Sequence, residues 1–523
     1  MVSFRPLSPL ANYLIASLEE KQQANHDERR ITVNPIVSKF ASWYERLRNA
    51  MEFREDEVIL RATIERILKR RLLLGGNGKT TAKPLVKELL WARYLPETDI
   101  GESVAKKIEE VIDIYLSMRL RILATHKFPE RTINDWTYDL MSSDIQYILN
   151  PKRSKELIAN FMFHVLKDDI SIEDESQETK NAQVFMAVRK AFARDDLAFL
   201  RYHLFCQYFG RLTPKTLDYT VEHFLEGYNE ILRQMHFVRR ERIYTYVRRR
   251  TAAFFIFEDV LESQKENLKT ILENEEALKE VVFEACEKRY KSISSRVRTA
   301  IIRSVIFILL TKVAFAFFVE GTYDKIMYGH IVWESLLINT GIPPLLMIIV
   351  SLFIRTPGQD NSERIFTYIS RLLHDDDPVL GNKLLIAKPQ NDKGLVTAFN
   401  ILWLLAFIIS FGAIIYVLTS LHFNIISQTI FVFFLAIVSF LSYRISLLAN
   451  VYRVGEKQGL GTLLVDFLFM PVIRVGSKLT QTVRQINIFL MLFDFFIEAP
   501  FKFLFAFFDQ WFYFLHGKTE ELE

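Results

Sequence analysis

Two ionisable side chains stand inside long apolar stretches in the second half of the chain. Lys312 lies within residues 301–319, and Glu334 lies near the start of residues 331–354. A charged group at membrane depth is costly unless it is paired, so such residues mark functional positions by default. If the two stretches form a hairpin, the flexible lysine can reach outward to meet the carboxylate. We therefore predict an intramembrane ion pair between Lys312 and Glu334.

The second of these stretches also contains two consecutive prolines. Pro343 and Pro344 follow Gly341 near its middle. Proline removes backbone donors and frees carbonyl groups, as in the discontinuous helices of transporters. The alternative is an ordinary proline kink, and we favour it because the later apolar stretches contain no matching break.

A basic cluster in the first half could bind an acidic surface. Its members are Arg239, Arg240, Arg242, Arg248, Arg249 and Arg250. An aromatic segment with Phe254, Phe255 and Phe257 follows directly. This combination suits anionic lipid, where each cation contributes about 1 kcal/mol, and an acidic partner protein could use the same charges. The alternative is that the phenylalanines belong to a core and the arginines pair with local acids such as Glu241 and Glu258.

Another polar set lies near the C-terminus, within the Phe-rich residues 485–515. At about 100° per residue its charged positions fall on one side of a helix. They are Asp494, Glu498, Lys502 and Asp509. Pro500 divides the segment into halves that are short for a membrane crossing. We expect these halves to lie flat on the membrane as amphipathic helices, and one tilted span is the alternative.

We find no motif that names a reaction or a cofactor. The glycines at 75, 76 and 78 resemble a phosphate-binding loop, but Leu73 stands where that motif needs glycine and the preceding residues look helical. A surface turn between two helices is the better interpretation. Two cysteines, Cys206 and Cys286, are too few for a disulfide scaffold or a cysteine-based zinc site. We therefore expect no metal, no cofactor and no catalytic residue.

Two halves of different composition must position these residues. Of the 523 residues 50% are hydrophobic, and nearly all long apolar runs follow residue 300. Four stretches reach the length of about 20 apolar residues that a spanning helix needs. They are residues 301–319, 331–354, 396–418 and 425–443.

The basic residues around these stretches indicate their orientation. Lys and Arg crowd the segment before the first stretch, the connection between the second and third, and the segment after the fourth. The two other connections contain only Lys325. Because basic loops resist translocation, this distribution predicts four spans with both termini in the cytoplasm.

The first half reads as a helical domain. Residues 34–298 repeat apolar positions with a period near 3.6 between breaks at Gly and Pro, and strand patterns are almost absent. No Gly or Pro occurs from residue 228 to residue 320, which predicts long helices leading to the first span. Six of eight heptad positions in residues 261–285 are apolar. That helix could form a coiled coil with a second copy, or it could pack on its own domain.

Together these patterns predict an all-α protein. A polytopic membrane domain of four spans plus interfacial amphipathic helices follows an N-terminal helical cytoplasmic domain. The expected parts are an N-terminal segment over residues 1–33, the cytoplasmic domain over 34–298, the spans over 299–448, the interfacial helices over 449–516 and a tail over 517–523.

We predict an integral membrane scaffold, tether or membrane-remodelling protein in the cell membrane, without catalytic activity. Its expected partners are the lipid bilayer, anionic lipid, a protein partner and a second copy of the chain. Nucleic acid is not expected, because a net charge of +4 is nearly balanced. The alternative function is an oligomeric channel or small-solute transporter, with Lys312, Glu334 and the two prolines lining the path.

Overall fold

The computed structural model describes most of the chain. Its described residues are 4–19, 38–39, 41–42, 45, 56–73, 75–95, 101–150, 153–264, 268–330, 333–378, 382–388, 393–420, 423, 425–455, 460–485, 507 and 511. The described residues form an all-α structure, and the strands among them are two segments of three residues each. The predicted all-α class is therefore confirmed.

The chain divides into two compact units. Unit 1 comprises Met1–Leu7, Arg249–Asp375 and Lys388–Asn487, and unit 2 comprises Ser8–Arg248, Asp376–Ala387 and Ile488–Glu523. The chain therefore passes repeatedly from one unit to the other.

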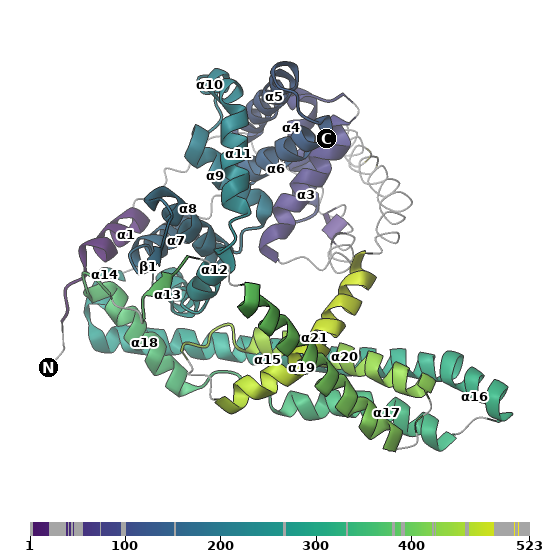
Figure 1. The fold of residues 1–523 in the computed structure, drawn as a ribbon. Helices are drawn as coiled ribbons and strands as arrows, with labels where there is room; N and C mark the ends of the chain where they lie inside the picture. The colour runs from purple at the N-terminus through teal and green to yellow at the C-terminus, as the bar shows by residue number, and fades with distance from the viewer. Residues whose placement is uncertain are drawn as a thin grey trace, which may run out of the picture. The chain divides into compact units, whose positions relative to one another are not determined.

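Unit 2 is a helical domain (Figure 1). Its elements are α1 (Pro9–Glu19), α3 (Asp56–Leu72), α4 (Gly78–Trp91), α5 (Glu102–Thr125), α6 (Glu130–Leu149), α7 (Arg153–Leu166), β1 (Ile170–Ile172), α8 (Gln177–Val188), the π-helix η1 (Arg189–Ala193), α9 (Leu197–Phe209), α10 (Leu217–Glu222), α11 (Phe224–Met235), α12 (Arg240–Arg248) and β2 (Leu384–Ile386). A core of Leu, Ile, Met and aromatic side chains lies between α3, α4, α5, α6, α9 and α11.

The glycine-rich segment after α3 is a turn between two helices, as predicted, and the structure adds that it caps α4. Gly75 has φ of 83°, a left-handed conformation that glycine adopts without strain. Asn77 caps α4: its side chain accepts a hydrogen bond from the backbone N–H of Thr80 at 3.0 Å. The N–H of Gly78 donates to the Asp113 carboxylate at 2.7 Å, so a side chain of unit 2 already occupies that donor.

A short parallel strand pair joins distant parts of unit 2. β2 comes from the connection between α18 and α19 and pairs with β1, with Ile172 opposite Ile386. The N–H of Leu384 donates to the carbonyl of Asp169 at 2.8 Å. Ile386 is fully buried, whereas Leu385 is 68% exposed, because neighbouring residues of a strand face opposite sides. The chain that connects α18 (Gln359–His374) to α19 (Lys393–Ser420), both in unit 1, therefore enters unit 2 and returns to unit 1.

Unit 1 contains the apolar helices (Figure 1). Its elements are α13 (Thr251–Ser263), α14 (Leu268–Glu273), α15 (Glu275–Phe315), the π-helix η2 (Ala316–Glu320), α16 (Gly321–Tyr328), α17 (Trp333–Leu352), α18 (Gln359–His374), α19 (Lys393–Ser420), α20 (Ile425–Ala449) and α21 (Leu460–Gln485). α15 has 41 residues, which is about 62 Å at about 1.5 Å per residue. Its first part packs on α13, α14 and α18, and its later part packs on α17 and α20.

Three helices are long and apolar enough to cross a membrane. They lie within Glu275–Met327, Gly394–Ser420 and Ile425–Ala449, and they coincide with three of the four predicted stretches. At the remaining stretch, Asn339–Leu352 is a shorter apolar helix within the described residues. α17 continues through Pro343 and Pro344, so the structure gives no interruption at these prolines.

The heptad pattern of residues 261–285 falls on three helices, α13, α14 and α15, rather than on one. The side chain of Asn274 accepts a hydrogen bond from the N–H of Glu276 at 3.1 Å and so starts α15 anew. Leu268 and Val282 are buried within unit 1. One continuous coiled-coil helix is therefore excluded there, and these residues pack on their own unit.

α21 crosses α20 at very close range. A Cβ added at Gly476 would lie 2.0 Å from the carbonyl oxygen of Ala436 and 2.9 Å from Cβ of Phe440. Only glycine lets the two backbones approach so closely. α21 packs on both α19 and α20, and the prediction that residues 449–516 lie on the membrane surface stays a prediction.

This crossing yields a prediction about stability. Gly476→Val is expected to push α20 and α21 apart and to destabilise the protein by about 1–3 kcal/mol through overpacking. Gly412→Val on α19 is the matched control, because a Cβ there meets nothing within 4 Å. Thermal unfolding of the detergent-solubilised protein measures both variants. Equal melting temperatures for the two would contradict the tight crossing.

Candidate functional site

A buried polar cluster lies inside the apolar helices of unit 1. Nζ of Lys312 on α15 donates to Oε1 of Glu320 at 2.5 Å. Nδ2 of Asn339 on α17 donates to the other carboxylate oxygen of Glu320 at 2.7 Å. Lys312 and Asn339 are fully buried, and Glu320 is 3% exposed. Two opposite charges and one amide are thus enclosed between helices.

The π-helix η2 sets the register of this ion pair. An α-helix turns by about 100° per residue, so residues eight apart lie about 80° apart around an unbroken helix. A π-bulge absorbs about one extra residue, and this makes the spacing equivalent to seven residues, which share a face. η2 ends at Glu320 and so brings this carboxylate onto the face of Lys312.

The surroundings of the cluster are apolar. Nζ of Lys312 lies 5.2 Å from the ring centroid of Phe434 on α20, a cation–π contact. α15, α17 and α20 all pack on one another. Few water molecules can compensate charges in such a place, so the lysine depends on Glu320 and on the aromatic face.

Two buried oxygen atoms on adjacent residues of α17 lack a hydrogen-bond partner among the described residues. They are Oδ1 of Asn339 and Oγ1 of Thr340. A buried acceptor without a donor costs about 1–3 kcal/mol. The cluster can therefore accept hydrogen bonds from a small polar molecule.

In the structure Lys312 is buried and pairs with Glu320, a partner that the sequence analysis does not name. The side chain of Glu334 lies outside the described residues, so its pairing with Lys312 stays a prediction. Sequence reasoning missed Glu320 and Asn339. A spacing of eight residues shares no face of a regular α-helix, and a lone asparagine in an apolar stretch carries no spacing signal.

Comparison with known proteins finds no matching family model, no similar curated protein and no similar solved structure. Function must therefore be argued from the geometry of this chain.

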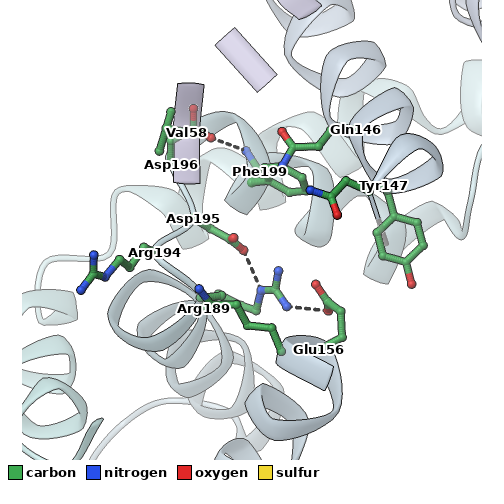
Figure 2. Close-up of a pocket in the computed structure, with 12 residues that line it drawn as sticks. Val58, Gln146, Tyr147, Glu156, Arg189, Arg194, Asp195, Asp196 and Phe199 are labelled. Atoms are coloured by element: carbon green, nitrogen blue, oxygen red, sulfur yellow. Dashed lines mark hydrogen bonds and ion pairs between the residues drawn. The ribbon is translucent and has the colours of Figure 1, made fainter. Parts of the chain in front are cut away.

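Unit 2 contains a small cavity beside its own π-helix. The cavity has a volume of about 40 Å³ and lies where the end of α6, the start of α7 and the connection from η1 to α9 meet. Figure 2 shows Asp195 and Glu156 on either side of the Arg189 guanidinium, which donates to them at 2.6 Å and 2.5 Å. Nε2 of His203 lies 3.3 Å from Asp195.

The carboxylates that line this cavity are held by cations. Asp195 and Glu156 pair with Arg189, and Asp196 pairs with Arg61 at 2.6 Å. Against the effect of burial, Arg189 and His203 hold the pKa of Asp195 below its usual value. These groups join α3, α7, η1 and α9, and a volume of this size has room for a few water molecules. The arrangement is a structural network rather than a free base poised for chemistry.

Other buried titratable groups of unit 2 are also tied into networks. Burial raises the pKa of Asp139 to about 6 despite its ion pair with Arg201. Burial likewise raises the pKa of the Cys206 thiol to about 11, which leaves it protonated and unreactive at neutral pH. Among the described residues no group of three or more His, Cys, Asp or Glu side chains could hold a metal ion.

The boundary between the units divides the predicted basic cluster: Arg239, Arg240, Arg242 and Arg248 belong to unit 2, whereas Arg249 and Arg250 belong to unit 1 with the aromatic segment. Phe254, Phe255 and Phe257 are buried in unit 1, as the alternative interpretation held. Arg239 pairs with Glu175 at 2.9 Å in unit 2. Arg240 donates to a backbone carbonyl of the same unit, and Arg250 is buried.

The other predicted lipid-binding residues are either exposed or outside the described residues. Arg242, Arg248 and Arg249 are exposed, so a role at anionic lipid stays a prediction for these three. The predicted stripe of Asp494, Glu498, Lys502 and Asp509 lies outside the described residues.

The buried ion pair yields a prediction about coupling. Lys312→Met alone is expected to destabilise the protein by about 3–5 kcal/mol, because it leaves the Glu320 carboxylate unpaired. The double variant Lys312→Met/Glu320→Gln should recover most of this loss, since both charges are gone. Unfolding of the solubilised protein in a denaturing detergent measures the cycle. A double variant that loses as much free energy of unfolding as Lys312→Met alone, or more, would show that the two side chains do not stabilise each other.

Proposed function

We propose that this protein is an integral membrane scaffold that holds a helical domain at the cytoplasmic face of the membrane. The observation that carries the proposal is β2: the chain between α18 and α19 leaves unit 1, pairs with β1 in unit 2 and returns. A domain threaded in this way is not a module on one flexible linker. It is attached to the apolar unit by several chain segments.

The proposed topology has four spans. The segment that precedes the apolar helices in the chain and the segment that follows them meet at α18. The start of α15 packs on α18, and residues 452–455, which follow α20, also dock there. Nη1 of Arg364 on α18 donates to the carbonyl of Gly455 at 3.0 Å. A chain that leaves α18 and returns to it crosses a bilayer an even number of times, which supports α17 as the return from α15 and α20 as the return from α19.

Basic residues support the cytoplasmic placement of that shared side. Lys and Arg concentrate before residue 300, between residues 355 and 393, and after residue 443, and all three segments adjoin the side where α18 lies. The opposite connections hold Lys325 as their basic residue. This asymmetry favours placing α18 and both termini in the cytoplasm.

Vesicle clustering tests the scaffold. Protein reconstituted with unit 2 facing outward is expected to cluster or deform liposomes, seen by light scattering and electron cryotomography. Ile386→Asp buries a charge at β2 and should abolish clustering by releasing the strand. Leu385→Asp is the matched control, because that side chain is exposed and should leave clustering unchanged.

Two outcomes would contradict the scaffold. One is wild-type vesicles that stay separate and spherical, and the other is clustering that Ile386→Asp leaves intact.

A second candidate function is transport of a small solute. The observation that favours it is the buried cluster of Lys312, Glu320 and Asn339, because ionisable groups inside an apolar bundle commonly mark ion or proton pathways.

A further inference from the structure

The geometry points to a proton-transfer site at the Lys312–Glu320–Asn339 cluster, at which a bound water molecule passes protons to and from the ion pair. This inference deepens the transport candidate and rests on it, not on the scaffold. The solute it names is the proton, carried by water.

The unpartnered acceptors supply the first argument. Oδ1 of Asn339 and Oγ1 of Thr340 lie on adjacent residues of α17, and neither has a donor among the described residues. Asn339 is fully buried, so bulk water does not reach it. A water molecule satisfies such groups by donating to them, and buried waters commonly do so. Its own oxygen then remains available to accept a proton.

The ion pair supplies the second argument. Nζ of Lys312 donates directly to Oε1 of Glu320 at 2.5 Å, in a charge-assisted hydrogen bond with no group between them. In an apolar site a proton moving from the ammonium to the carboxylate neutralises both groups at once, and this removes the cost of burying two charges. The pair can therefore hold its shared proton on either atom.

A transfer cycle follows without any net change in the protein. The bound water receives a proton from one side of the membrane and delivers it to the Glu320 carboxylate, forming its O–H bond. The Lys312 ammonium releases one proton to water on the other side and is restored by the proton from Glu320. One proton enters and one leaves, driven by the membrane potential or by a pH gradient.

Two buried serines lie on α20, one on either side of Phe434 along the helix. Ser427 and Ser442 are each 5% exposed within the helices, and they lie seven and eight residues from Phe434. These separations correspond to about 10–12 Å along the helix. The hydroxyl of Ser442 donates to Sδ of Met347 at 3.2 Å. The Ser442 hydroxyl can still accept a hydrogen bond, so it can bind a water molecule on its side of the cluster.

The enclosure of the cluster selects the proton over larger solutes. Both charged side chains and Asn339 are at least 97% buried. A hydrated ion needs an open path, whereas a proton moves along hydrogen bonds. The neighbouring charged groups are few: Arg303 on α15, Lys325 on α16 and Arg444 on α20 are exposed. The side chains of Asp324 and Glu334 lie outside the described residues.

A flux assay tests the relay. Wild-type protein goes into potassium-loaded liposomes with an internal pH-sensitive dye, and valinomycin sets the membrane potential. Proton entry is expected to exceed that of empty liposomes and to fall about tenfold or more in Glu320→Gln, which cannot exchange a proton. Lys312→Met/Glu320→Gln should show the same loss. Thr311→Val is the matched control, because the Thr311 hydroxyl bonds to the carbonyl of Phe307 on its own helix.

A spectroscopic measurement keeps the inference falsifiable if a variant fails to fold. Infrared difference spectra of the wild type at two pH values should show the C=O stretch of a buried carboxylic acid appearing on acidification. The band should be absent in Glu320→Gln and retained in Thr311→Val. Absence of this band in the wild type would overturn the relay.

The remaining outcomes separate the relay from the functions proposed above. Wild-type proton flux equal to that of empty liposomes, or full flux in Glu320→Gln, overturns the relay. If the wild type carries potassium or chloride but no protons, transport survives and the relay fails. Vesicle clustering without any flux would support the scaffold and contradict both transport and the relay.

Discussion

The fold of unit 1 depends on the side chain of Asn361. Its Nδ2 donates to the Tyr290 hydroxyl and to the carbonyl of Tyr452, both at 2.7 Å, and its Oδ1 accepts from the N–H of Val454 at 2.8 Å. These bonds join α15, α18 and the segment after α20, which are about 70 to 90 residues apart in the chain. Asn361 is 7% exposed, so water cannot replace the bonds cheaply. α15, α18 and the segment after α20 are thus held together at one junction.

This junction fixes the position of the residues further along α15. α15 runs unbroken from this junction into the apolar bundle, so its lysine is carried to a fixed depth between α17 and α20. A buried lysine must be paired, and the π-helix η2 supplies Glu320 in the register that the pair needs. The proposed scaffold and the proposed proton relay therefore both rest on one long helix. Its polar half is fixed to α18, and its apolar half carries a buried charge.

The sequence predicts the large features of this protein well, because burial leaves periodic and compositional signals. The all-α class, three of the apolar helices and the turn between α3 and α4 all follow from local patterns. The sequence leaves open whether Phe254–Phe257 lie in a core or at lipid, since an apolar run beside arginines fits either place. Four spans and a cytoplasmic N-terminal domain remain proposals that rest on the shared junction at α18.

The missed features depend on contacts between distant residues or on irregular helix geometry. Glu320 escapes notice because a π-bulge is invisible to a period of 3.6 residues. β2 has three residues, too few to show a strand period. The break before α15 depends on one capping side chain, Asn274, in a segment without Gly or Pro. The bonds of Asn361 join segments that no local pattern relates.

Labelling of single cysteines in intact cells tests the central claim most directly, which is that α15 leaves the side of α18 and α17 returns to it. In a chain with Cys206 and Cys286 replaced by alanine, Thr322→Cys lies in α16 and Gln359→Cys begins α18, and both positions are exposed. A membrane-impermeant maleimide is predicted to label Thr322→Cys from outside and to label Gln359→Cys only after permeabilisation. Labelling of both positions from the same side would contradict the account.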